Sequence, residues 1–236
     1  MPKLIFDIET IGEDFDSLDK TTQDSLTRWI KREARSDEEY QAKLKDLKEG
    51  LGFSPLTGEI VALGILDCEK NQAVVYFSAP NKDIKEYSKD NFIFKQKTEE
   101  EMLKSFWEGA RKYQEFIGFN SRCFDVPFIM ARSAKHKIKP TKNLMFNRYL
   151  SSQRFDAKHI DLLDQLSFYG AMQRKGSLHL WCRLFGIKSP KGQGVTGDEV
   201  SSLYAQGEYQ KIAEYNSWDL RATRELYERW QEYFNI

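Results

Sequence analysis

The sequence is poor in the residues that build disulfide frameworks and zinc sites. It holds three cysteines among 236 residues, and Cys68, Cys123 and Cys182 lie far apart without C-x-x-C spacing. An odd, widely spaced set of this kind indicates neither a disulfide framework nor a zinc site, so we expect buried free thiols. The three histidines also lack motif spacing, and we assign them structural or surface positions.

Long apolar runs are absent as well. No stretch approaches the roughly 20 apolar residues that a membrane helix needs, and Met1 precedes strand-like sequence instead of a signal peptide. We therefore expect a cytoplasmic protein without a membrane partner. Its 40% hydrophobic content is enough for a sizeable core, and its length predicts a single domain over residues 1–236.

The third deficit is net charge, because 36 Lys and Arg residues balance 36 Asp and Glu residues. The balance conceals an uneven distribution. Between Val126 and Gln193 there are 13 basic residues and 3 acidic ones, and the rest of the chain carries the compensating negative excess. Such a stretch fits either a solvated basic surface or a contact surface for a polyanion.

Strand-like and helical patterns alternate along the chain, which predicts an α/β mixed sheet flanked by helices. We expect strands at 3–9, 59–68, 72–79 and 115–119, the second and third forming a hairpin. Helices are predicted at 98–113, 124–137 and 208–234, the first with Thr98 as its N-cap. Residues 13–50 are charge-dense with helical spacing, which indicates a helical insertion after the first strand.

The first strand, LIFDIET at residues 4–10, carries two acids in an otherwise apolar run. Residues two apart in a strand point to the same side, so Asp7 and Glu9 share one face while Phe6 and Ile8 share the other. The two carboxylates repel each other, and a hard cation such as Mg²⁺ or Mn²⁺ would compensate that repulsion. The pair alone also fits an exposed strand edge, because D-x-E often occurs by chance.

Two further segments add candidate ligands. In GFNSRCFDVPFI, residues 118–129, Asp125 lies near the start of a predicted helix, where the helix dipole favours a carboxylate even without a metal. In YNSWDLRATREL, residues 215–226, Tyr215 and Asp219 are four apart and share one helical face. Taken singly, these positions also fit a simple first-turn acid and a surface pair.

In this order the three segments resemble the D-E-D-D superfamily of 3′-to-5′ exonucleases, also called DnaQ-like, which has the ribonuclease H-like fold. The tyrosine four residues before the last aspartate makes the third segment resemble that of the Y-type branch. The chain looks like predicted exonucleases related to the proofreading domain of family-B DNA polymerases. The likeness spans nearly the whole chain and includes HIDLLDQL at 159–166 and SLHLWCRLFGI at 177–187.

The resemblance implies hydrolysis of a terminal phosphodiester with two Mg²⁺ or Mn²⁺ ions about 3.5–4 Å apart. By resemblance, Asp7 bridges both ions, Glu9 and Asp219 complete the shell of the nucleophile-side ion, and Asp125 serves the other through water. Tyr215 is assigned to orienting the attacking water, since a phenol with an unperturbed pKa near 10 is largely protonated at neutral pH.

The same resemblance implies nucleic acid with a free 3′ end as the partner. Thr10, Asn120 and Phe124 lie near the terminal nucleotide in the family, and the ring of Phe124 fits either base stacking or the core. The basic stretch from Arg132 to Lys191 would contact phosphates. Single-stranded DNA is the favoured substrate with RNA as a possibility, and a polymerase partner would act in trans.

Two other interpretations remain. A catalytically silent nuclease-like module could bind nucleic acid or a polymerase, and loss of one ligand would mark it, although all four acids and the tyrosine are present. A calcium-binding or structural acidic cluster is the other, and the sequence has no EF-hand pattern.

Overall fold

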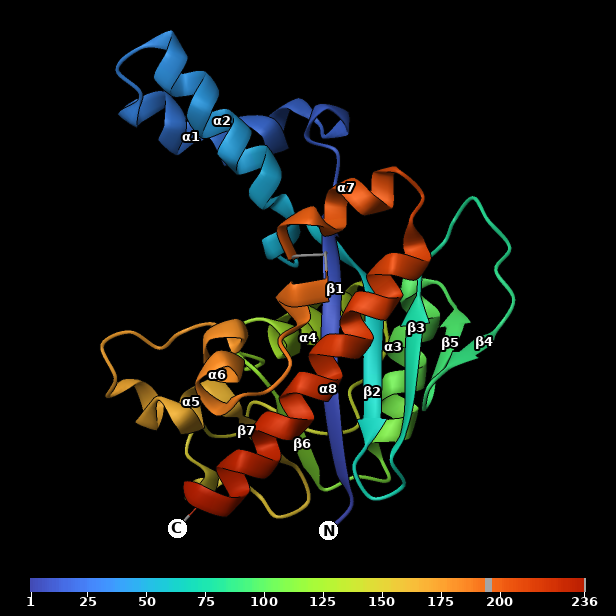
Figure 1. The fold of residues 1–236 in the computed structure, drawn as a ribbon. Coiled ribbons are helices and arrows are strands. Elements are labelled where there is room, and N and C mark those ends of the chain that lie inside the picture. Colours follow the sequence, from blue (N-terminus) through green and yellow to red (C-terminus); the bar gives the residue numbers. More distant parts are fainter. Residues whose placement is uncertain (194–196, 236) are drawn as a thin grey trace.

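A seven-stranded mixed sheet with helices on both faces forms the body of the protein (Figure 1). The structure is a computed structural model that describes residues 1–193 and 197–235. The strands lie in the order β4-β5-β3-β2-β1-β6-β7 across the sheet. Their bounds are β1 Lys3–Gly12, β2 Gly58–Asp67, β3 Gln72–Phe77, β4 Tyr87–Lys89, β5 Phe92–Gln96, β6 Glu115–Gly118 and β7 Lys158–Asp161. The mixed α/β sheet predicted from the sequence is thus confirmed.

The central strand β1 has different partners on its two sides. It pairs antiparallel with β2 along its whole length, whereas its parallel pairing with β6 ends at Ile5 and Ile117. Strand β7 continues the parallel set beyond β6. The carboxyl ends of β1, β6 and β7 therefore lie at one edge of the sheet, which is where open α/β sheets bind ligands.

The sequence patterns located four strands and missed three. Strands β2 and β3 form the predicted antiparallel hairpin, and β6 is the predicted fourth strand. Strands β4 and β5 were not predicted, although Phe92 and Phe94 of β5 alternate with exposed Ile93 in the period of a half-buried strand. Strand β7 has only four residues, too few to show a period of its own.

Two hydrophobic cores lie on opposite faces of the sheet. Helices α3 (Glu99–Ala110) and α4 (Asp125–Lys135) cover one face and pack on Leu4, Phe6 and Ile8 of β1. Helix α8 (Tyr209–Tyr233) crosses the other face and packs on the β1–β3 region, together with α6 (Leu178–Phe185) and α7 (Val200–Ala205) (Figure 1). Helix α5 (Leu162–Leu166) follows β7 directly. The predicted helices are confirmed, including Thr98 as the N-cap of α3, where it also forms a capping box with Glu101.

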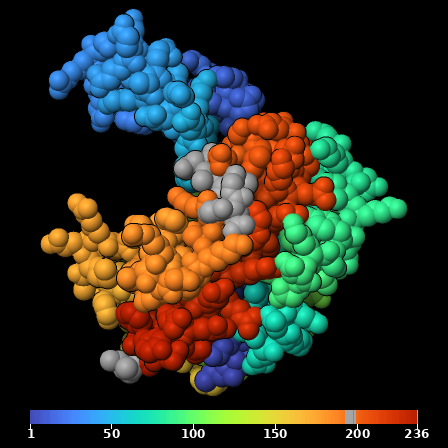
Figure 2. All heavy atoms as spheres, in the orientation of Figure 1, coloured from blue at the N-terminus to red at the C-terminus, as the bar shows by residue number. Residues whose placement is uncertain are grey.

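Residues 13–50 form most of an arm that projects from the end of β1 (Figures 1 and 2). It contains α1 (Lys20–Glu33) and α2 (Asp37–Gly50), which begin at the capping side chains of Asp19 and Ser36. A short 3₁₀ helix, Leu51–Phe53, returns the chain to β2. The helical character predicted for this segment is confirmed.

The expectations about the cysteines and about membrane-spanning helices can be compared with the structure. Cys182 is buried and Cys68 is partly buried, but Cys123 is exposed, so the expectation of three buried thiols was wrong for Cys123, which lies in the loop after β6. Among the residues that the structure describes, no helix combines the length and the apolar character needed to cross a bilayer.

A buried ion pair fastens α3 to α4 and to the sheet. The carboxylate of Glu99 accepts hydrogen bonds from Nε and Nη2 of Arg132, both at 2.8 Å, and from the backbone N–H of Ile60 at 2.8 Å. The side chain of Arg132 is 4% exposed and that of Glu99 is 9% exposed. A guanidinium at this depth depends on its carboxylate partner.

Glu99→Ala is therefore expected to lower the free energy of unfolding by about 3–5 kcal/mol, because Arg132 is left buried and uncompensated. Glu100→Ala is the matched control: its carboxylate pairs with Lys104 in solvent on the same helical turn, so little change is expected. Urea unfolding of the three proteins measures both effects. Equal midpoints for the Glu99 and Glu100 variants would contradict the structural role of the buried pair.

Candidate active site

Strand β1 carries Asp7 and Glu9 on the face that α8 covers. Phe6 and Ile8 point to the opposite core with α3 and α4, as the alternation of a strand requires. Asp7 lies opposite Gly64 of β2 in the antiparallel register. The prediction that the two acids share a face is confirmed.

Helix α8 brings Tyr215, Asn216 and Asp219 over these acids, and Gly64 allows the close approach. A Cβ atom on Gly64 would lie 2.0 Å from Oδ1 of Asn216 and 2.5 Å from Cδ1 of Leu220. A larger residue at position 64 would therefore clash with the side chains of Asn216 and Leu220. Glycine at this position thus sets the distance between the acids of the strand and those of the helix.

Three carboxylates converge where β1 and α8 cross. One oxygen from each of Asp7, Glu9 and Asp219 lies within 4.8 Å of the other two. Glu9 is 7% exposed and Asp219 is 9% exposed. Burial and the neighbouring carboxylates raise the pKa of Asp7 and of Glu9 well above their usual values. Burial also raises the pKa of Asp219 to about 7, against the lowering effect of its hydrogen bond with Tyr215.

Asp125 approaches the cluster from the other side of β1. Its carboxylate accepts a hydrogen bond of 3.1 Å from the backbone N–H of Ile8, a donor that β6 leaves free because its pairing with β1 ends at Ile5. Burial raises the pKa of Asp125 to about 7. The charge of Asp125 also contributes to the raised pKa values of Asp7 and Glu9, so the four acids form one electrostatic unit.

The loop that delivers Asp125 is held by Asp161, a residue that the sequence patterns did not single out. Asp161 ends β7 and is 3% exposed. Its carboxylate accepts hydrogen bonds from the backbone N–H groups of Asn120 at 3.0 Å and Arg122 at 2.9 Å. The pattern HIDLLD contained a signal, since Asp161 also caps α5.

Asn216 was missed too, and its contact crosses 209 residues of sequence. Its side chain is fully buried, and Nδ2 donates a hydrogen bond of 2.8 Å to Oδ2 of Asp7. The same amide lowers the pKa of Glu9, in part offsetting the effect of burial. Asn216 is thus a neutral donor among acids, and it holds the Asp7 carboxylate in one orientation.

Tyr215 completes the helical side of the site. Its hydroxyl is hydrogen-bonded to Asp219, and burial together with the charges of Asp219, Glu9 and Asp7 raises its pKa above the ordinary value. The phenol therefore keeps its proton at neutral pH and acts as a hydrogen-bond donor.

The three expected substrate residues lie in two places. Asn120 and Phe124 line the cleft that contains Asp7, Glu9, Asp125 and Asp219. Phe124 also packs on Phe128, with ring centroids 5.3 Å apart. Thr10 follows a register shift in β1 and donates a hydrogen bond of 2.7 Å to the carbonyl of Gly52, so its side chain contacts the base of the arm.

The donor set suits hard divalent cations. The cleft presents four carboxylates that repel one another, and oxygen ligands of this kind are those that Mg²⁺ and Mn²⁺ prefer. Burial raises the pKa values of all four acids, and mutual repulsion adds to the shift for Asp7 and Glu9. A bound cation would lower them and hold the acids ionised.

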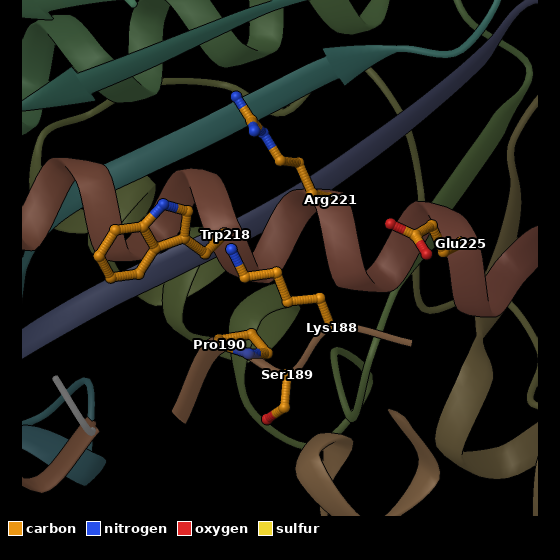
Figure 3. Close-up of a pocket in the computed structure, with 6 residues that line it drawn as sticks. All are labelled: Lys188, Ser189, Pro190, Trp218, Arg221 and Glu225. Carbon is orange, nitrogen blue, oxygen red and sulfur yellow. The ribbon is translucent and has the colours of Figure 1, made fainter. Parts of the chain in front are cut away.

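A second cavity lies on the outward side of α8 and has different chemistry. It is lined by Lys188, Ser189, Pro190, Trp218, Arg221 and Glu225 (Figure 3). Arg221 points away from Lys188 and pairs with Asp90 at 2.5 Å. Because this cavity has a single carboxylate, the acidic cleft is the better candidate for a metal-dependent active site.

Comparisons with known proteins agree with this geometry. A family model described as "Predicted 3'-5' exonuclease related to the exonuclease domain of PolB" matches residues 71–235, more than two thirds of the chain. The match includes Asp125, Tyr215 and Asp219, whereas Asp7 and Glu9 precede it. No curated protein matches the sequence.

Among solved structures, the chain is similar to the family B DNA polymerase from the hyperthermophilic archaeon Pyrobaculum calidifontis. The sequence identity is 15% and the TM-score is 0.57. The alignment covers 98% of this chain but 24% of the polymerase, so the likeness concerns about a quarter of the larger protein. It confirms the predicted ribonuclease H-like fold.

The buried acids predict an unusual pH dependence of stability in EDTA. Asp219 has a pKa of about 7 in the folded protein and an ordinary value near 3.8 when unfolded, so the folded state holds the proton more tightly. Its stabilising contribution is complete below pH 4 and is lost as the pH rises through 7. Asp219→Asn should therefore raise Tm by about 3–5 °C at pH 8 and by less at pH 5.

Thermal melting in EDTA between pH 5 and 8 measures this difference. Asp156→Asn, which changes an exposed acid paired with Arg154, serves as the control and should follow the wild type. Parallel pH profiles for wild type and Asp219→Asn would show that Asp219 does not carry a raised pKa.

Proposed function

Because the chain belongs to the family of predicted 3′-5′ exonucleases related to the exonuclease domain of PolB, we propose that it is a metal-dependent 3′-to-5′ exonuclease. The observation that carries the proposal is the convergence of Asp7, Glu9 and Asp219 within 4.8 Å in a cleft that also contains Asp125. A binding module would not need four mutually repelling buried acids.

The acids would hold two divalent ions, Mg²⁺ or Mn²⁺. Asp7 would serve both ions, Glu9 and Asp219 would serve one of them, and Asp125 would serve the other. The ions would activate the attacking water and stabilise the leaving 3′ oxygen of the terminal phosphodiester. Removal of the metal ions would stop the reaction without unfolding the chain.

Neighbouring side chains would orient the attacking water and two of the acids. The hydroxyl of Tyr215 is hydrogen-bonded to Asp219, so it can position the attacking water beside that carboxylate. Asn216 fixes the carboxylate of Asp7, and Asp161 fixes the loop that carries Asp125. Catalysis by such a site depends on this pre-organisation.

The substrate we propose is a single strand with a free 3′ end. Asn120 and Phe124 lie in the cleft beside the acids. A terminal nucleotide held by these two residues would place its phosphodiester at the acids. DNA is favoured and RNA is a possible substrate, since both present the same phosphodiester. If the enzyme proofreads, a separate polymerase would act with it in trans.

Tyr215→Phe is expected to lower the single-turnover rate about 10- to 1000-fold, because one positioning hydrogen bond is lost while the acids remain. Asp7→Ala should remove nearly all activity. The measurement is the product ladder from 5′-labelled single-stranded DNA and RNA with Mg²⁺, Mn²⁺ or EDTA. Undiminished cleavage in EDTA, or internal cuts alone, would contradict the proposal, and an unchanged rate for Tyr215→Phe would remove the tyrosine from it.

Asn216→Ala is expected to weaken Mg²⁺ binding about 10-fold, since partners that orient metal ligands contribute 10- to 100-fold to affinity. Ser217→Ala is the matched control: Ser217 is 4% exposed on the same helix, but its hydroxyl bonds the carbonyl of Glu214. Calorimetric titration of the three proteins with Mg²⁺ tests the role of Asn216 independently of cleavage. Identical affinities for the Asn216 and Ser217 variants would refute it.

A further inference from the structure

Two segments, one between α4 and β7 and one after α5, present aromatic rings to solvent. The side chains of Phe146, Tyr149 and Phe168 are 51%, 53% and 59% exposed. Tyr169 joins them, because its ring lies 4.8 Å from that of Tyr149, centroid to centroid. We call these four residues the aromatic ridge. Exposed rings gathered in this way are typical of a binding surface.

The backbone of the ridge adopts a costly conformation to present two of these rings. Phe168 and Tyr169 have φ angles of 50° and 56°, in the left-handed region that bulky residues rarely occupy. Such residues persist where the surroundings impose them, and they concentrate at functional sites. The hydroxyl of Tyr169 accepts a hydrogen bond from the backbone N–H of Leu150, which ties the two loops together.

The segment that carries Phe146 and Tyr149 contacts the loop that lines the cleft. Arg122 lies in the loop between Asn120 and Phe124, and its guanidinium donates to the carbonyl of Asn147 and, at 3.6 Å, to Sδ of Met145. Its neighbour along the ridge, Arg148, lies over the ring of Tyr169 at 6.0 Å. A strand that leaves the cleft past Arg122 therefore meets the ridge next.

The charge of this surface fits a polyanion. Residues 141–191 contain nine Lys and Arg residues and three acids. Two of those acids, Asp161 and Asp164, are buried, and Asp164 pairs with Arg148. Figure 2 shows this gold and orange segment as one wall of a hollow that faces the blue arm.

We propose that the aromatic ridge binds the nucleotides of a single strand upstream of its 3′ end, by base stacking on the rings and phosphate contact with the basic side chains. This inference rests on the proposed function, and it adds a length requirement to it. Phe168 packs on Phe234, which lies about 22 Å beyond Asp219 along α8. At about 3.4 Å per stacked nucleotide, a strand whose 3′ end lies at the acids needs about six nucleotides to reach Phe168.

The test compares twelve-nucleotide and three-nucleotide strands of DNA, labelled at the 5′ end. Tyr149→Ala combined with Phe168→Ala should weaken binding of the longer strand about 5- to 100-fold, as loss of base–aromatic stacking does. The preference of wild type for the longer strand, measured as the ratio of kcat/KM values, should fall by a similar factor. Fluorescence anisotropy in EDTA gives the affinity without cleavage.

Two further variants make the result decisive. Tyr149→Leu with Phe168→Leu keeps the apolar bulk and lacks the aromatic faces, so it should lose affinity as the alanine variant does even if the latter unfolds. Ile93→Ala removes an exposed apolar side chain in β5, on the far side of the sheet from β7, and should match wild type.

Equal affinity of wild type and the leucine variant for the longer strand would overturn the inference and leave the ridge to a protein partner. Absence of cleavage in every protein would instead contradict the proposed function, while the anisotropy measurements would still decide whether the ridge binds nucleic acid.

Discussion

The close contact between α8 and the sheet at Gly64 is the constraint on which the site depends. A Cβ at this position would lie 2.0 Å from Asn216, so the helix can reach the strands only over glycine. That approach places Asp219 beside Asp7 and Glu9, and it buries the amide that donates to Asp7. The absence of a side chain at Gly64 thus determines how close the acids of β1 and α8 lie to one another.

The site is unfavourable for stability and is retained by specific compensation. Burial and mutual repulsion raise the pKa values of the acids, which is the signature of charge held without sufficient partners. The N–H of Ile8, the amide of Asn216 and the phenol of Tyr215 each offset part of this cost. Two hydrophobic cores, one on each face of the sheet, supply the stability that the cluster lacks.

Asp7, Glu9, Tyr215 and Asp219 could be predicted from the sequence because each belongs to a local period, whereas Asp125 was recognised from the order of the three acidic segments and their resemblance to a known family. The alternation of β1 places Asp7 and Glu9 on one face, and the four-residue spacing on α8 does the same for Tyr215 and Asp219. Asn216 and Asp161 could not be found in this way, since their roles depend on contacts across 209 and 41 residues. Strand β7 was missed for a different reason, because its four residues are too few to show a period.

The register shift between Glu9 and Thr10 separates two functions of one strand. Before it, β1 supports the acids; after it, the chain turns toward the arm, and Thr10 bonds the return segment at Gly52. A bulge absorbs a change of length or twist locally. The arm therefore joins the sheet outside the segment that holds Asp7 and Glu9, so a displacement of its helices would be absorbed at the register shift before it reached the carboxylates.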